Sequence, residues 1–167
     1  TPKPKASGAN RGYQVNTGGS ALDHPIIYGK MRVGGAIVYD ESTGTNNKLF
    51  HRIIAVAGHE VESFDKIYIN DEVVTLDSSG NVTSPAKYVK NDLKRVRQLN
   101  SSGEYEWVYQ ASTNYLVRFK FHNGSPTQAA DTNLVAESEH WTSEHKLSGI
   151  AYMYVRLQHD ADAFPNG

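Results

Sequence analysis

The sequence predicts a mainly β fold, a sandwich or barrel-like antiparallel domain with one short helix, and three observations favour it. Apolar runs rich in β-branched residues recur along the chain and end at clusters of turn-forming residues. Residues 115–122 alternate, because Val117, Phe119 and Phe121 face one way while polar side chains face the other. Residues 129–146 are the best candidate for a helix, and even there the apolar positions are sparse.

Each expected strand follows from the residue pattern of its own segment, taken here in chain order. Gly34 and Gly35 interrupt the first run and predict a bent strand, since no helix follows that could form a phosphate-binding loop. In the next run, 52–57, the residues after Arg52 are apolar at odd and even positions alike, which predicts a strand covered on both faces. The main strands are expected at residues 26–39, 50–57, 66–70, 104–110, 115–122 and 150–158, with another at 72–76.

Three further segments complete the expected architecture. Residues 77–81 form a turn cluster. Residues 87–99 fit either a helix or a solvated strand. A short surface helix is expected within 129–146, capped by Asp131 or Thr132.

Length and composition bound the organisation and the function. The 167 residues fit one domain: a flexible arm over 1–22, poor in apolar side chains, and a β-rich domain over 23–167. The 17 basic and 18 acidic residues give a net charge of -1, which weighs against specific nucleic-acid binding. The absence of cysteine excludes disulfides and thiolate chemistry. No apolar stretch approaches the roughly 18 residues of a membrane-spanning helix.

Several polar groups invite a metal site, yet none has a recognised spacing. On a helix His140 and Glu144 would share one face, but the two-histidine spacing of a zinc protease is missing. The 77–81 cluster resembles half of a calcium loop without its closing glutamate. We therefore expect no metal and no cofactor, and interpret these residues as a polar helix face and a hairpin turn.

Acid–base catalysis is also weakly supported. His59 beside Glu60 could be an oriented general base, but no nucleophile pattern accompanies it, so hydrogen bonding to backbone at a sheet corner is the favoured interpretation. His159, Asp160 and Asp162 could include a carboxylate pair for glycoside hydrolysis, but such loops are commonplace. No catalytic residue is assigned, and the chain is expected not to be an enzyme.

Four strings carry a family resemblance. Residues 24–39 read HPIIYGKMRVGGAIVY, 50–61 read FHRIIAVAGHEV, 67–72 read IYINDE and 148–157 read SGIAYMYVRL. Their order resembles the opening of phage tail-tip hub proteins, the tip attachment protein J-like family. The likeness covers about 21–73 and 147–167, and residues 75–146 are expected to be a lineage-specific insertion or elaboration.

The resemblance implies a structural virion protein: an N-terminal domain of the tail-tip, or baseplate, hub of a bacteriophage, within a longer polypeptide. It implies a homotrimer that closes the tail tube and takes part in host attachment and genome delivery. The partners would be neighbouring tail tube and distal tail proteins, with a host receptor reached through downstream domains.

The alternative is a carbohydrate-binding or cell-wall-degrading module of a tail appendage. Tyr105, Trp107 and Tyr109 lie on one strand face. A sugar platform would expose that face and a structural domain would bury it, so the exposure of Trp107 separates the two expectations.

Overall fold

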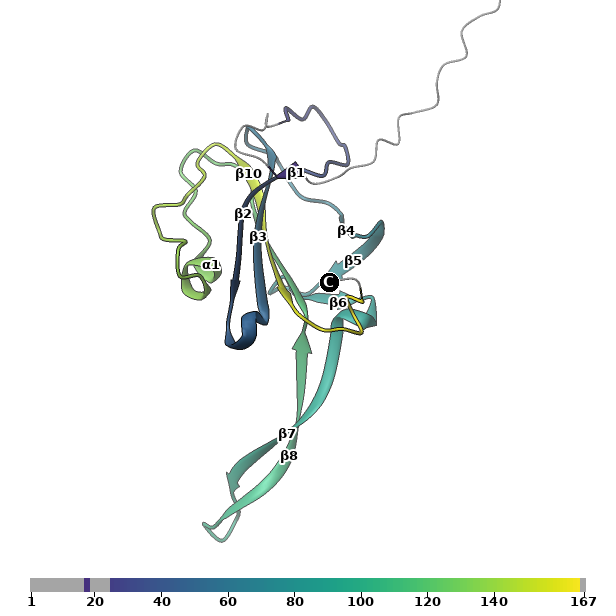
Figure 1. The fold of residues 1–167 in the computed structure, drawn as a ribbon, viewed down its shortest axis with the longest axis vertical. Coiled ribbons are helices and arrows are strands. Elements are labelled where there is room, and N and C mark those ends of the chain that lie inside the picture. Colours follow the sequence, from purple (N-terminus) through teal and green to yellow (C-terminus); the bar gives the residue numbers. More distant parts are fainter. Residues whose placement is uncertain (1–16, 19–24, 166–167) are drawn as a thin grey trace, which may run out of the picture.

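The computed structural model describes residues 17–18 and 25–165, and the predicted mainly β, antiparallel fold with one short helix is confirmed (Figure 1). The strands are β1 (Thr17–Gly18), β2 (Ala36–Thr43), β3 (Leu49–Ala57), β4 (Ile67–Ile69), β5 (Glu72–Leu76), β6 (Val82–Ser84), β7 (Val89–Leu99), β8 (Tyr105–Tyr115), β9 (Val117–His122) and β10 (Ala151–Gln158). The helices are α1 (Thr132–Glu137) and the 3-10 turns η1 (Thr45–Asn47) and η2 (Ala86–Tyr88).

A five-stranded sheet in the order β1-β2-β3-β10-β9 organises the fold. The short β1 is parallel to β2, and all other neighbours are antiparallel. β3 lies at the centre and pairs with β2 on one side and β10 on the other. The sheet therefore joins segments that are about 100 residues apart in the chain.

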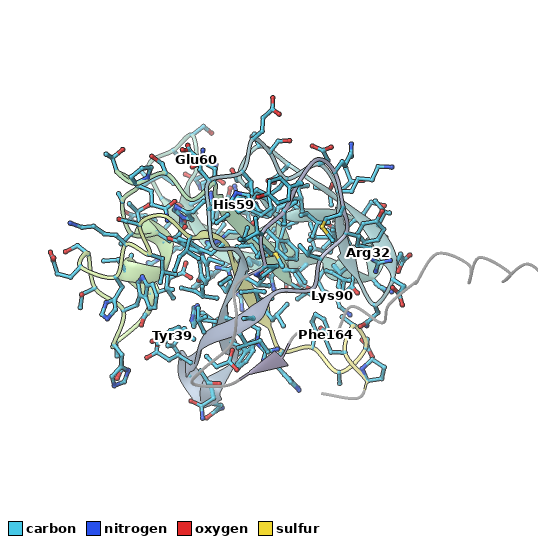
Figure 2. The ribbon with its side chains drawn as sticks, turned by 90° about the horizontal axis from the view of Figure 1, so that it is seen from above. Arg32, Tyr39, His59, Glu60, Lys90 and Phe164 are labelled. Carbon is cyan, nitrogen blue, oxygen red and sulfur yellow. The ribbon has the colours of Figure 1, made fainter. Side chains whose placement is uncertain are left out.

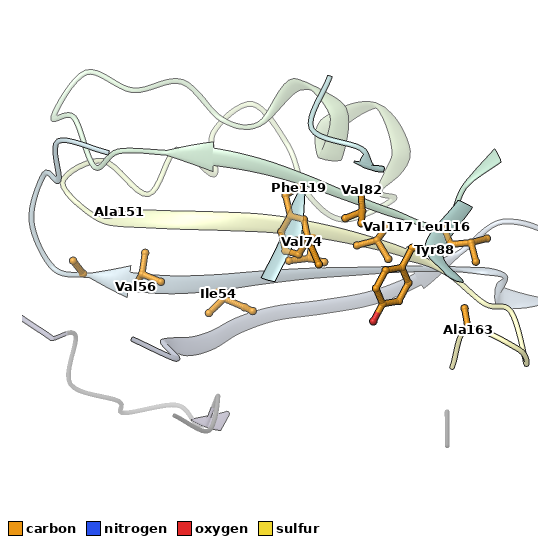
Figure 3. Close-up of a cluster of buried hydrophobic side chains, with 12 residues drawn as sticks. Ile54, Val56, Val74, Val82, Tyr88, Leu116, Val117, Phe119, Ala151 and Ala163 are labelled. Carbon is orange, nitrogen blue, oxygen red and sulfur yellow. The ribbon is translucent and has the colours of Figure 1, made fainter. Parts of the chain in front are cut away.

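The prediction that β3 is covered on both faces is confirmed. Ile54 and Val56 belong to the larger core cluster, together with Val117, Phe119 and Val155 from β9 and β10 (Figure 3). On the opposite face Ile53 packs in a second cluster, whose other members are Leu134, Trp141, Tyr152 and Tyr154. The alternation predicted for β9 and β10 divides their side chains between these two faces as expected.

A three-stranded sheet, β4-β5-β6, adds Val74 and Val82 to the larger core. The predicted turn at 77–81 joins β5 to β6, and the Asp77 carboxylate accepts hydrogen bonds from the backbone N–H groups of Ser79 and Asn81. At its tip Gly80 has φ +83°, and its carbonyl accepts a bond from the Phe119 N–H. The turn thus fastens the small sheet to β9.

β7 and β8 form a hairpin of two 11-residue strands that projects away from both sheets (Figure 1). Its root is anchored, because Tyr88 and Leu116 are buried in the larger core and Leu116 donates its N–H to the Tyr88 carbonyl. Lys90 adds an ion pair to Asp160 and Asp162. Beyond this root the hairpin extends away from the body, and each of its strands is about 35 Å long.

One expected strand needs correction, and two other segments are now defined. The strand expected over 26–39 begins only at Ala36, because Gly35 has φ +88° and passes so close to β3 that a Cβ there would lie 2.6 Å from the Ala55 carbonyl oxygen. The short helix expected within 129–146 is confirmed: it spans six residues, is capped by Asp131, and ends where the Ser138 hydroxyl accepts from the N–H groups of His140 and Trp141. The ambiguous segment 87–99 is mostly strand.

The organisation of the domain has two further aspects. Apart from Thr17–Gly18, the arm expected over 1–22 lies outside the described residues. The segment expected to be an elaboration, 75–146, is integrated into the body, since it supplies β9 and the buried Val82, Tyr88 and Leu116. It also supplies the hairpin and α1.

Gly80→Ala should be far more damaging than Gly103→Ala. Both glycines have positive φ, so both substitutions carry the strain of a left-handed alanine, about 1 kcal/mol. A Cβ on Gly80 would lie 2.0 Å from the Phe119 carbonyl oxygen, whereas one on Gly103 meets nothing within 4 Å. Urea unfolding should show a loss of about 3 kcal/mol for Gly80→Ala and about 1 or less for Gly103→Ala. Equal losses would contradict this packing of the turn on β9.

Candidate functional site

The histidine singled out from sequence, His59, is held by backbone groups. Its Nε2 accepts a hydrogen bond from the Ile27 N–H at 2.8 Å, so Nδ1 carries the proton and donates to the Glu60 carbonyl at 2.8 Å (Figure 2). The predicted hydrogen bonding of His59 to backbone groups is confirmed. With both ring nitrogens engaged, His59 fastens the segment before β2 to the end of β3.

The C-terminal aspartates anchor the hairpin root. Asp160 accepts bonds from the N–H groups of Asp162 and Ala163, and both carboxylates pair with Lys90. The bond from the Ala163 N–H, and after it those from Lys90 and the Asp162 N–H, hold the pKa of Asp160 below its ordinary value. A carboxylate kept ionised in this way is poorly suited to act as the general acid of a glycosidase.

His140 and Glu144 do not share a helix face, because α1 ends before both of them. His140 instead places Nδ1 2.7 Å from Glu41 on β2, and the Tyr39 hydroxyl donates to the same carboxylate at 2.8 Å. The N–H of Glu139 also donates to Glu41. Burial acts to raise the pKa of Glu41, but the bonds from Ser138, His140 and Tyr39 outweigh it and lower the pKa to about 2.

Two negative findings apply to residues 17–18 and 25–165. No three histidine, aspartate or glutamate side chains in this part of the chain gather as ligands for one metal ion. Within the same residues, every helix is too short or too polar to cross a bilayer.

Sequence reasoning missed a buried network around His51, whose side chain is fully buried under α1. Its Nε2 lies 2.7 Å from the Thr43 hydroxyl and its Nδ1 2.7 Å from the Tyr154 hydroxyl. Tyr154 donates its proton to Glu137 on α1, so its oxygen accepts from His51 Nδ1 and leaves Nε2 to accept from Thr43. The signal was available, because His51 shares its strand parity with Ile53 and so faces the same buried layer.

The composition of the His51 network resembles that of a nucleophile–base–acid relay, but its geometry is that of a structural cross-link between the sheet and α1. Tyr154 stands between the imidazole and the carboxylate, and Arg118 binds both oxygens of Glu137 at 2.9 Å. Burial lowers the pKa of His51, which favours the neutral imidazole. The network therefore joins β2, β3, β9 and β10 to α1 and holds the helix on the sheet.

The feature that requires a function is one face of the hairpin. Antiparallel register places opposed residues on the same side, and the pairs Arg95–Tyr109, Arg97–Trp107 and Leu99–Tyr105 fall together. We call this side the aromatic face; it comprises Leu93, Arg95, Arg97, Leu99, Tyr105, Trp107, Tyr109 and Ala111, all exposed. The opposite side carries polar residues around the half-buried pair Val96–Val108.

The aromatic face is cationic as well as apolar. The Arg95 guanidinium lies 4.7 Å from the centre of the Trp107 ring, and that of Arg97 lies 4.7 Å from the Tyr105 ring. The face contains no aspartate or glutamate, and neither arginine has an ion-pair partner among residues 25–165. The guanidinium N–H groups therefore remain available to an external carboxylate.

Trp107 is 57% exposed, with Tyr105 at 61% and Tyr109 at 71%. The sequence-derived expectation that a structural domain would bury this face is thus not met in the single chain. The prediction that the three aromatic residues share one face is confirmed. An exposed face of this composition is typical of a binding surface, for a sugar or for another protein.

Comparison with known proteins adds no assignment: no family model, no curated protein and no solved structure matches this chain at a significant level. The strings behind the tail-tip resemblance fold into β2, β3, β4, β10 and their turns, so they specify the scaffold. The hairpin lies outside them.

Glu41→Gln should destabilise the domain at neutral pH and cost little in acid. Because the folded pKa of Glu41 is about 2 and its ordinary value is 4.5, its stabilisation is present above pH 4.5 and is lost as the pH falls toward 2. Urea unfolding at pH 6 should show a loss of about 1–2 kcal/mol. That loss should shrink steadily toward pH 2.5.

The matched control for Glu41→Gln is Glu139→Gln, an exposed neighbour in the same cluster whose backbone, not its side chain, binds Glu41. It should change stability little at either pH. A Glu41→Gln loss that is independent of pH would contradict the assignment of an ionised carboxylate bound by His140 and Tyr39.

Proposed function

We propose that this chain is a structural domain of a bacteriophage tail-tip hub, located at the tail tip of the virion. In the intact hub it would form a homotrimer that closes the tail tube and takes part in attachment and genome delivery. Its neighbours would be tail tube and distal tail proteins, and the host receptor would be reached through other domains of the polypeptide. In this proposal the chain assembles and positions, and performs no catalysis.

The observation that carries the proposal is the aromatic face. Two-stranded hairpins are marginally stable alone, yet this one is anchored at its root and extends its most apolar side into solvent. A scaffold that presents such a face is suited to bury it against another protein during assembly. The four strings that resemble tail-tip hubs supply the class of assembly.

The composition of the face favours a protein partner over a sugar. Carbohydrate platforms use the open faces of aromatic rings, but here Arg95 covers a face of Trp107 and Arg97 covers a face of Tyr105. Aromatic residues with arginine, and without acidic residues, are typical of the centre of protein interfaces.

Immunogold electron microscopy of phage particles produced by cells that carry this reading frame tests the proposal. Antibody raised against the purified chain should label intact particles at the distal end of the tail. Label on free enzyme fractions or on the host envelope, with particles unlabelled, would contradict a virion role. Particles that lack the gene product serve as the control and should have tails that are unfinished at the tip.

Carbohydrate binding is the second candidate, because the exposed Trp107 is the result expected for a sugar platform. Titration of the chain with oligosaccharides from host peptidoglycan and lipopolysaccharide, followed by tryptophan fluorescence, separates the two. We expect no saturable change in the wild type. Saturable binding that Trp107→Ala abolishes and Glu106→Ala retains would replace protein docking with sugar recognition.

A further inference from the structure

We propose that the aromatic face of one copy docks into a hollow beside α1 of a second copy of the same chain. Trp107 would lie against the apolar wall of the hollow, and an arginine of the face would pair with Glu144. This inference names the partner of the surface on which the proposed function rests. It also assigns a role to the hairpin and to the region of α1, which both belong to segment 75–146.

The hollow has the chemistry that the aromatic face lacks. It is an open, shallow hollow of about 400 Å³ between α1 and the loop that follows it, and its wall is mainly apolar. Its lining includes Ala129, Ala130, Val135, Ala136, Glu144 and Lys146. Glu144 has no ion-pair partner among residues 25–165, so its carboxylate is available to a guanidinium.

Two other ways of covering the face fit less well, one because of charge and one because it buries no aromatic ring. Two aromatic faces packed against each other would bring Arg95 and Arg97 of both copies together with no carboxylate between them. Pairing through hairpin edges would extend the sheet but leave the aromatic rings in water. A complementary surface must therefore come from elsewhere in the partner.

A second exposed apolar group fits less well than the hollow. Ile26, Tyr28 and Met31 precede β2 and are exposed, but the charges among them are Lys30 and Arg32. The carboxylates that pair with these cations, Asp65 and Asp71, are thereby occupied. This group offers an arginine-bearing face no free acid, whereas Glu144 does.

The contact must form between copies. α1 packs on one face of the five-stranded sheet, whereas the hairpin, which leads into β9, points away from the body (Figure 1). A hairpin and a hollow at separate places on each copy make a head-to-tail contact, which closes into a ring when the rotation between copies allows it.

Sedimentation velocity of the chain from micromolar to near-millimolar concentration tests the proposal. The wild type should associate reversibly. Trp107→Ala and Glu144→Lys should each weaken association by about tenfold or more, and Lys146→Glu should strengthen it. Glu106→Ala, on the opposite side of β8, is the matched control and should leave association unchanged.

Mixing provides the sharpest result. Trp107→Ala keeps an intact hollow and Glu144→Lys keeps an intact hairpin, so an equimolar mixture of these two monomeric variants should form a one-to-one dimer. A wild type that stays monomeric throughout, or association that both variants leave unchanged, overturns the proposal. Association lost in Tyr28→Ala but kept in Trp107→Ala overturns it too and places the contact before β2. Particle labelling is independent of these outcomes, so the tail-tip assignment can stand if this contact fails.

Discussion

The fold depends on one constraint, the burial of β3 on both of its faces. Ile54 and Val56 point into the core shared with the three-stranded sheet, while Ile53 points into the layer under α1. A strand buried in this way must have hydrogen-bonded neighbours on both edges, which β2 and β10 provide. The two faces then determine where everything else lies: β4–β6 cover one, and α1 covers the other.

The two faces are covered by different physical means. The side of the three-stranded sheet is closed by aliphatic and aromatic side chains in one continuous cluster. The α1 side has a smaller apolar cluster and relies on ionic and hydrogen-bonded clamps, in which Glu137 binds Arg118 and Asp131 binds His122. Such clamps fix position well but add little net stability, because desolvation offsets much of the attraction. The helix that borders the proposed docking hollow is therefore held in place mainly by ionic and hydrogen-bonded contacts, with few apolar contacts.

The sequence predicted what periodicity encodes. Two-sided burial of β3, alternation in β9 and β10, the turn at Asp77 and the backbone-bonded His59 all followed from local patterns. It failed where long-range contacts decide. The late start of β2 depends on the approach of Gly35 to Ala55. The helix was expected to be short, but its end depends on Ser138 and on Glu41, about 100 residues away.

The candidate site was half visible from sequence. Period-two spacing placed Tyr105, Trp107 and Tyr109 on one face, but their exposure depends on whether another layer covers β8, which no local pattern records. Residues 87–99 were ambiguous for a related reason: a strand with no core against it has no apolar alternation to reveal it. The arginines that complete the face were consequently recognised only when β7 was paired with β8.

A stable β body carries the hairpin, and we propose that a partner completes its aromatic face. Hydrogen exchange at each backbone amide, followed in dilute and in concentrated solution, tests this most directly. In dilute solution amides of β3 and β10 should exchange slowest, and those of 92–98 and 106–112 much faster, because few buried contacts support them. On concentration, protection should rise in the hairpin and in 129–146 together. Hairpin amides as protected as β3 in dilute solution, and unchanged on concentration, would contradict the account.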